Sequence, residues 1–368
     1  MKAVKMIVWL TLLLFVVPAE AQEIKPKEVR AVMKKVADWQ IDHYRDAYSG
    51  YAEPHHPLDW TNAALYIGME KWAAMSEDDS YYEWLMKVGE DHKWNLHDRI
   101  YVADDHAVGQ VYLELFRKYQ KEQMIEPTKE RFNYIMLHPA KTSLQWNAPY
   151  HLDRWNWCDA LFMSPPVWAK LYKITGERKY LDFMMTEFKA TTEFLFDEKE
   201  GLYYRDEQYI GKLDQGTKVF WSRGNGWVFA GLVNIMNELD PKSEENKYFL
   251  GIYKKMAQKL LTIQTPQGHW SMSLLGQAFY PTPETSGTSF FIYGLAWGIN
   301  NGILDQASYA PVVKKGWTAL VGHVSKKGML GYVQPIGAEP GKAWIDKTEV
   351  YGTGAFLSAG SEVYKMYQ

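Results

Sequence analysis

The stretch Trp155–Pro166 reads WNWCDALFMSPP and sets one carboxylate, Asp159, among aromatic side chains immediately before an apolar helical run. A carboxylic acid surrounded by indoles is disfavoured as an anion, so its pKa is expected to rise toward the range in which a proton donor works. The position also suits a helix cap, because aspartate accepts hydrogen bonds from the free N–H groups of a first turn. We therefore interpret Asp159 as either a catalytic acid or the cap of a helix over residues 160–175.

The design of this stretch, a charged polar turn followed by a helix of small and apolar residues, recurs along the chain. The six helices of this kind are predicted to begin near Asp59, Asp104, Asp159, Arg223, Glu284 and Glu349. Between them the periodicity predicts amphipathic helices over residues 27–44, 79–91, 128–136, 178–194, 245–262 and 309–326.

Helices that are apolar nearly all round belong inside a protein, and amphipathic helices belong outside. Six inner and six outer helices predict an all-α fold, an (α/α)6 toroid or six-hairpin barrel. An open helical solenoid is the alternative. Its stacked repeats fit less well, because the inner helices start at unequal intervals of 45 to 65 residues.

Residues 1–21 have the composition of a secretory signal peptide, with two lysines, a short apolar run and the small-residue exit Ala19–Glu20–Ala21. A membrane anchor is the alternative, but the run is shorter than the ~20 residues that cross a bilayer. Cys158 is the only cysteine, so no internal disulfide is possible. We predict that residues 22–368 form a single catalytic domain without membrane contact, exported to a bacterial periplasm or secreted.

Composition narrows the classes of partner. The net charge is −3, with 41 basic and 44 acidic residues, and no basic run is long enough to follow phosphates, so nucleic acid is not expected. The 16 Trp and 25 Tyr exceed what a core requires and are typical of carbohydrate clefts. His55 and His56 lack a third ligand at a suitable spacing, so we expect no metal or cofactor. Exposed aromatics are too dispersed to define an interface, and a monomer or weak homodimer is expected.

Charged residues stand at the start of every predicted inner helix, so a toroid brings them to one mouth. Arg223 is the hardest of them to explain as a cap, because positive charge is unfavourable at a helix N-terminus. In the sequence FWSRGNGW it lies between Trp221 and Trp227. A guanidinium fork binds carboxylates bidentately, so the motif predicts a pocket for an acidic sugar. An arginine paired with a structural carboxylate is the alternative.

Five motifs follow one another in a recognisable order. They are DDHAVG at Asp104–Gly109, WCDALFM at Trp157–Met163, WSRGNGW at Trp221–Trp227, ETSGT at Glu284–Thr288 and GTGAFLSA at Gly352–Ala359. Together they resemble glycoside hydrolase family 105, the unsaturated rhamnogalacturonyl hydrolases, which are relatives of the unsaturated glucuronyl hydrolases. The resemblance extends over essentially the whole chain after the signal peptide.

This resemblance implies a hydrolase that removes a 4,5-unsaturated uronic acid from the non-reducing end of lyase-generated oligosaccharides, with pectin or rhamnogalacturonan fragments the first expectation. It implies hydration of a vinyl ether, in which Asp159 protonates C4 and helps water add at C5. A second carboxylate falls at Asp104 or Asp105, which the motif does not separate. The residues expected to hold the oligosaccharide are Arg223, Trp157, Trp221, Trp227, Trp60, His106 and Arg205.

Two departures from the family pattern affect these expectations. Arg205–Asp206 stands where many members have a histidine, so this arginine is interpreted as reading another acidic group or a different leaving sugar. His106–Ala107–Val108 replaces a frequent Asn-Pro pair. We interpret His106 as filling the rim rather than as a second base, because second catalytic bases are rare.

Two other functions remain compatible with the sequence. A conventional inverting glycosidase would use Asp159 with Asp104 or Asp105 as acid and base, and would act on saturated sugars. A carbohydrate-binding toroid without catalysis would bind sugar and form no product. The clustered carboxylates argue against the binding protein, because acidic sugars favour cations at the mouth.

Overall fold

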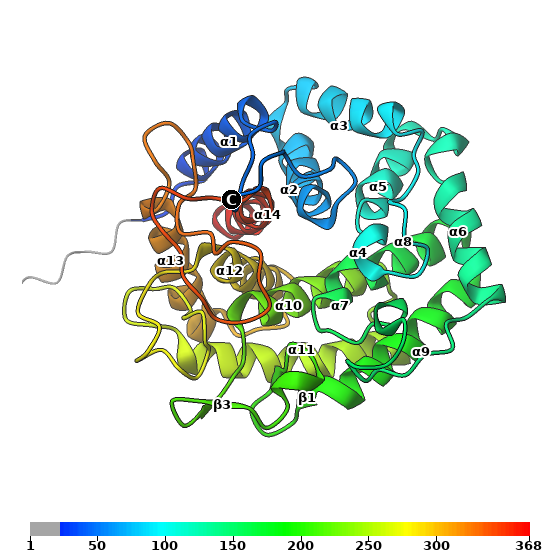
Figure 1. The fold of residues 1–368 in the computed structure, drawn as a ribbon. Helices are drawn as coiled ribbons and strands as arrows, with labels where there is room; N and C mark the ends of the chain where they lie inside the picture. The colour runs from blue at the N-terminus through cyan, green and yellow to red at the C-terminus, as the bar shows by residue number, and fades with distance from the viewer. Residues whose placement is uncertain (1–22) are drawn as a thin grey trace, which may run out of the picture.

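The computed structural model describes residues 23–368, so the predicted signal peptide lies outside the described residues. Within this range helices form two concentric rings, as predicted, and Figure 1 looks along their common axis. The outer ring consists of α1 (Pro26–Asp42), α3 (Ser80–Asp91), α6 (Glu126–Leu137), α9 (Arg178–Leu195), α11 (Glu244–Ile263) and α13 (Gln306–Gly322). The inner ring consists of α2 (Trp60–Ser76), α4 (Ala103–His106) with α5 (Gly109–Tyr119), α7 (Ala160–Met163) with α8 (Pro165–Thr175), α10 (Ser222–Met236), α12 (Thr285–Asn300) and α14 (Val350–Tyr367).

Burial explains why the two sets of helices separate. Every residue of α10 is buried, and α12 is buried along nearly its whole length. On the outer helix α9, by contrast, the buried residues form one stripe that faces the inner ring. The all-α (α/α)6 toroid predicted from the sequence is therefore confirmed.

Two inner helices are interrupted, which the sequence analysis did not predict. The helix expected over residues 160–175 breaks at Ser164, because Pro165 and Pro166 have no N–H to continue the hydrogen-bond ladder of α7. The freed Ser164 hydroxyl bonds Nδ1 of His106 at 2.8 Å and accepts from the Trp168 indole at 3.1 Å. The preceding inner helix is also divided, into α4 and α5, although no proline stands between them.

The remaining elements are short and lie in loops. Within the described residues, β1 (Phe196–Asp197) pairs with β2 (Leu202–Tyr203), and β3 (Leu213–Asp214) pairs with β4 (Thr217–Lys218), both antiparallel. Single 3₁₀ turns occur at η1 (Glu122–Met124), η2 (His151–Asp153) and η3 (Glu207–Tyr209). Ser273 forms an isolated antiparallel bridge with Trp221. No helix in residues 23–368 is long and apolar enough to cross a membrane.

The ring closes where its last inner helix, α14, packs between α2 and α12. Two glycines allow the backbones of α2 and α14 to touch. A Cβ atom built on Gly354 would lie 2.1 Å from the carbonyl oxygen of Ala64, and one on Gly68 would lie 2.1 Å from the carbonyl oxygen of Gly354. Because an added Cβ atom would clash with backbone atoms, no change of side-chain conformation could relieve the clash.

We expect Gly354→Ala to lower the free energy of unfolding by about 3 kcal/mol, since an added methyl group must force two inner helices apart. The matched control is Gly251→Ala on the outer helix α11, where a new Cβ would meet no atom within 4 Å. That control should gain about 0.5–1 kcal/mol from helix propensity. Urea denaturation of both variants provides the comparison. Equal midpoints would contradict the proposed tight contact.

Candidate active site

Asp159 lies at the start of α7, at the mouth of the toroid, and only 9 % of its surface is exposed. Its side chain makes no capping hydrogen bond to α7, so the geometry does not support the capping interpretation. Instead, Oδ2 accepts from the Cys158 thiol at 3.5 Å and lies 3.8 Å from Nε of Arg205. Asp159 is thus a largely buried carboxyl group that is free of helix-capping contacts.

Asp104 and Asp105 are neighbours on α4, but their surroundings differ. Asp105 is buried and accepts from the backbone N–H of Arg99 at 2.7 Å and from Arg99 Nη2 at 2.6 Å. Nδ1 of His97 lies 3.1 Å from the same carboxylate. Burial raises the pKa of Asp105, but these contacts outweigh it and the net pKa is lowered. Asp105 is therefore a fixed anion whose oxygens are already occupied.

The carboxylate of Asp104 makes no hydrogen bond to residues 23–368, and it is close enough to Asp159 for the two charges to interact. Burial, followed by the negative charge of Asp159, raises the pKa of Asp104 to about 7. Burial also raises the pKa of Asp159, against the opposing charges of Arg205 and Arg223. Because the two carboxyl groups repel each other as anions, the pair tends to retain a proton toward neutral pH. Such a pair is equipped for acid and base chemistry.

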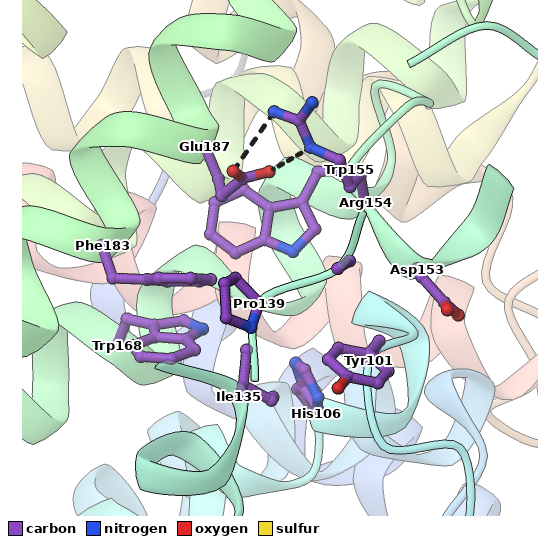
Figure 2. Close-up of a pocket in the computed structure, with 11 residues that line it drawn as sticks. Tyr101, His106, Ile135, Pro139, Asp153, Arg154, Trp155, Trp168, Phe183 and Glu187 are labelled. Carbon is purple, nitrogen blue, oxygen red and sulfur yellow. Dashed lines mark hydrogen bonds and ion pairs between the residues drawn. The ribbon is translucent and has the colours of Figure 1, made fainter. Parts of the chain in front are cut away.

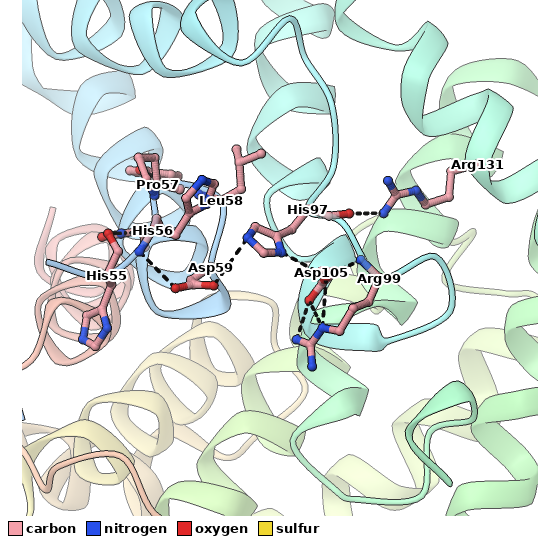
Figure 3. A network of polar contacts seen from close by, with 11 residues as sticks. His55, His56, Pro57, Leu58, Asp59, His97, Arg99, Asp105 and Arg131 are labelled. Atoms are coloured by element: carbon pink, nitrogen blue, oxygen red, sulfur yellow. Dashed lines mark hydrogen bonds and ion pairs between the residues drawn. The ribbon is translucent and has the colours of Figure 1, made fainter. Parts of the chain in front are cut away.

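The polar network beside the pair connects three segments of the rim (Figure 3). His97 links Asp105 to Asp59, whose Oδ1 lies 3.7 Å from Nε2 of His97. Arg131 on α6 donates to the carbonyl oxygen of His97. Among residues 23–368, no group of three or more His, Cys, Asp or Glu side chains is arranged to hold a metal ion. These contacts fix the loop that precedes α4, the short helix that carries Asp104.

Arg223 is fully buried, and its guanidinium makes hydrogen bonds to the backbone of a distant loop. Nη1 donates to the carbonyl oxygen of Gln334 at 2.7 Å, and Nη2 donates to that of Pro335 at 2.8 Å. Its planar group also lies over the rings of Trp221 and Tyr351, 4.5 Å and 4.9 Å from their centroids. In this geometry Arg223 holds the loop at residues 334–335 in place. Direct contact of Arg223 with a substrate carboxylate stays a prediction.

The predicted aromatic residues surround the mouth at different depths. Trp157, Trp221 and Trp227 are at most 3 % exposed and belong to the packed layer beneath the rim. Trp60 is less buried and stacks on Tyr351 at 5.2 Å between ring centroids. Contact of these four indoles with a sugar ring stays a prediction.

His106 is buried behind the pair and is held on both sides, by Ser164 and by the carbonyl oxygen of Ile100 at 2.8 Å. Burial lowers the pKa of His106 to about 4, so the imidazole is neutral at ordinary pH. It also lines a cavity of about 30 Å³ between α6, α8 and α9 (Figure 2). Neither Asp104 nor Asp159 lines that cavity. These contacts favour the interpretation of His106 as a structural residue.

The carboxylates of two acidic residues at the starts of inner helices are already engaged by other groups of the protein. Glu284 is buried and caps α12, accepting from the backbone N–H groups of Ser286 at 3.0 Å and Gly287 at 2.7 Å. Glu349 lies 3.0 Å from Nε2 of His55 and accepts from Ser49. Glu284 and Glu349 are thus engaged by protein groups, whereas Asp159 accepts from the Cys158 thiol and the carboxylate of Asp104 makes no hydrogen bond to residues 23–368. The convergence of the inner-helix starts on one active site stays a prediction.

Sequence reasoning missed several residues that shape this site. Arg99 and His97, which seal Asp105, occupy a loop without periodicity, and Gln334 and Pro335, which hold Arg223, lie more than a hundred residues away from it. Trp146 also escaped notice, although its ring lies 4.9 Å from the Arg205 guanidinium carbon. The aromatic excess was a signal for such a residue, but it could not single out one tryptophan among 16.

Comparison with known proteins shows the family to which the chain belongs. The family model described as Glycosyl Hydrolase Family 88 matches residues 32–367. Proteins named unsaturated 3S-rhamnoglycuronyl hydrolase are similar to this chain. The protein from Alteromonas sp. (strain LOR) is 37% identical over 91% of this chain and 85% of its own length. The one from Formosa agariphila is 36% identical over 92% and 91%.

Solved structures agree on the fold. A family 88 glycosyl hydrolase from Bacteroides vulgatus is 27% identical with a TM-score of 0.83, covering 93% of this chain and 100% of that protein. A possible member of family GH105 from Salmonella enterica subsp. enterica serovar Paratyphi A has a TM-score of 0.77 at 18% identity, covering 94% and 96%. At that identity the second likeness concerns the fold alone.

Proposed function

Because this chain belongs to glycosyl hydrolase family 88 and is a glycoside hydrolase, we propose that it removes a 4,5-unsaturated uronic acid from the non-reducing end of oligosaccharides in which the uronate is linked to rhamnose. The names of the Alteromonas and Formosa relatives support a substrate that contains an unsaturated uronate linked to rhamnose. The observation that carries the proposal is the pairing of Asp104 and Asp159, in which burial and mutual repulsion favour retention of a proton.

In the proposed reaction, protonated Asp159 gives its proton to C4 of the C4–C5 double bond. Positive charge then develops at C5 and the ring oxygen. The resulting Asp159 carboxylate accepts a proton from the water that adds to C5 and forms a hemiketal. The hemiketal opens to a ketone at C5, and the former ring oxygen stays on C1 as the hydroxyl group of a hemiacetal. The hemiacetal then collapses to an aldehyde at C1 and releases the neighbouring sugar as an alcohol. Asp104, rather than Asp105, is the second carboxylate because its oxygens are not sealed by Arg99 and His97.

We further propose that cleavage after residue 21 releases one catalytic domain, residues 22–368, to a periplasm or the medium as a monomer or weak homodimer. The composition of the N-terminal segment supports export. Comparison of the mass of the protein in cell fractions with that of the full chain tests this proposal. A full-length chain retained in the cytoplasm would contradict it.

The activity is tested by following the ultraviolet absorbance of the unsaturated uronide. Mature protein is incubated with lyase-generated fragments of rhamnogalacturonan, of sulfated rhamnose-containing polymers and of glycosaminoglycans. We expect absorbance to fall on at least one rhamnose-containing substrate and to stay constant on glycosaminoglycan fragments. Constant absorbance on every fragment, together with release of saturated sugars, would instead establish a conventional inverting glycosidase.

A further inference from the structure

Arg205 is the arginine beside the acid pair whose bidentate edge is left free. We propose that the Nε and Nη2 edge of Arg205 binds two oxygens of an anionic group on the substrate, either a carboxylate or a sulfate ester, and thereby selects the oligosaccharide. This inference rests on the function proposed above and names the group that the site recognises.

The hydrogen bonds of Arg205 occupy only one corner of its guanidinium. Nη1 donates to Oδ2 of Asp206 at 2.6 Å, which fixes the plane of the group. Nε is buried and has no hydrogen-bond partner among the described residues, and Nη2 makes no hydrogen bond to them. Asp159 lies beyond hydrogen-bond distance, at 3.8 Å from Nε. Because a buried N–H without a partner is costly, the free edge indicates a missing acceptor.

The other arginines at the mouth are already engaged. Arg99 uses Nε and Nη2 on the carboxylate of Asp105. Arg223 directs both terminal nitrogens at the backbone carbonyl oxygens of residues 334 and 335. Of these three guanidinium groups, only that of Arg205 combines a free side-on fork with a position beside Asp159. Side-on forks of this kind match the two-oxygen geometry of carboxylate and sulfate groups.

The loop that contains Trp146 supports Arg205 from one face. The Trp146 ring centroid is 4.9 Å from the Arg205 guanidinium carbon. The backbone N–H of Trp146 donates to Oε2 of Glu207 at 2.8 Å, and its ring also packs on His151 at 4.8 Å. Stacking covers one face of the guanidinium and leaves the hydrogen-bond donors of Nε and Nη2 unpaired, so the proposed anion site is preorganised before substrate arrives.

An anion on Arg205 would also affect catalysis. In the free protein the positive charge of Arg205 opposes the burial that raises the pKa of Asp159. A bound anion neutralises that charge, so Asp159 holds its proton more firmly once substrate is in place. Recognition of the substrate and protonation of the acid would therefore be coupled.

The test compares Arg205→Lys, which keeps the charge and loses the fork, with Arg205→Gln, which loses both. Two substrates are used, an unsaturated uronyl-rhamnose disaccharide with and without a 3-sulfate on rhamnose. We expect Arg205→Lys to raise KM roughly 10- to 100-fold, the usual cost of losing a charged bidentate contact, with a much smaller change in kcat. The matched control is Arg154→Lys, which changes another bidentate arginine, one that pairs with Glu187 away from Asp159.

The two substrates identify the source of the anion. If Arg205 binds the sulfate, its replacement should abolish the preference of the enzyme for the sulfated disaccharide. If it binds the uronate carboxylate, KM should rise equally for both. An unchanged KM with a lower kcat and a displaced pH profile would contradict the proposal that Arg205 binds the anion. Arg205 would then act only through its effect on Asp159.

Calorimetric binding separates this inference from the proposed function. The dissociation constants of both disaccharides are measured for Asp159→Asn with and without Arg205→Lys. Weaker binding in the double variant supports the receptor even where the absorbance assay shows no turnover. Equal binding in an enzyme whose wild type is active refutes the receptor and leaves the proposed function standing.

Discussion

Asp159→Asn is expected to reduce kcat on the unsaturated disaccharide by about 10³-fold, the typical contribution of a positioned general acid. Asparagine has nearly the same shape and occupies the same site at the start of α7, but it cannot give a proton to C4. KM should change little, because the carboxyl group acts in the transition state more than in substrate binding. The rate is measured by loss of the ultraviolet band.

The control for this variant is Asp153→Asn, which removes a rim carboxylate that lines the cavity of Figure 2 and lies outside the acid pair. Its kcat should remain close to that of the wild type. Circular dichroism should show the same helix content in all three proteins. An Asp159→Asn protein that retains wild-type activity would exclude Asp159 as the acid.

Asp104→Asn is expected to lower kcat by about 10²–10³-fold while making the protein more stable at alkaline pH. Burial and the charge of Asp159 raise the pKa of Asp104 to about 7 in the folded protein, against 3.8 for an ordinary aspartate. The folded state therefore binds the proton more tightly than the unfolded state. Stability is full below the unfolded pKa and falls as pH rises toward the folded pKa.

Removal of this carboxylate should accordingly raise the free energy of unfolding by about 2–4 kcal/mol at pH 8 and by almost nothing at pH 4. Guanidinium denaturation at the two pH values measures the difference. In the wild type, activity should fall as pH rises through about 7, where the pair loses its retained proton. In Asp104→Asn the residual activity should fall at lower pH, because Asp159 loses a repelling neighbour. A variant that is less stable at pH 8 would contradict the electrostatic assignment.

Much of the fold was predictable because its pattern is regular. Helices of small and apolar residues alternate with amphipathic ones, and burial alone is enough to sort them into two rings. The interruptions of the inner helices were harder to predict from the sequence. Pro165 and Pro166 are compatible with the end of one helix and also with the first turn of the next, where proline is favoured.

The sequence indicated which residues belong to the candidate site, but not which hydrogen bonds and ion pairs they make. Asp104 and Asp105 are adjacent in sequence, and what distinguishes them is the guanidinium of Arg99. Arg223 was expected to offer a free fork, but its acceptors are backbone carbonyl oxygens, which every residue carries and no sequence motif marks. Contacts of this kind depend on where a distant loop comes to rest, and that is a property of the assembled ring.

The seam between α2 and α14 has a consequence for how the protein reaches its native state. The first and last inner helices meet there through the contact between Gly68 and Gly354, two residues that are far apart in the chain. Contacts so distant in sequence form late, because a long loop must close before they stabilise anything. A nascent chain that lacks α14 leaves the apolar flanks of α2 and α12 uncovered. The ring therefore cannot close before α14 has been synthesised and has reached the gap between α2 and α12.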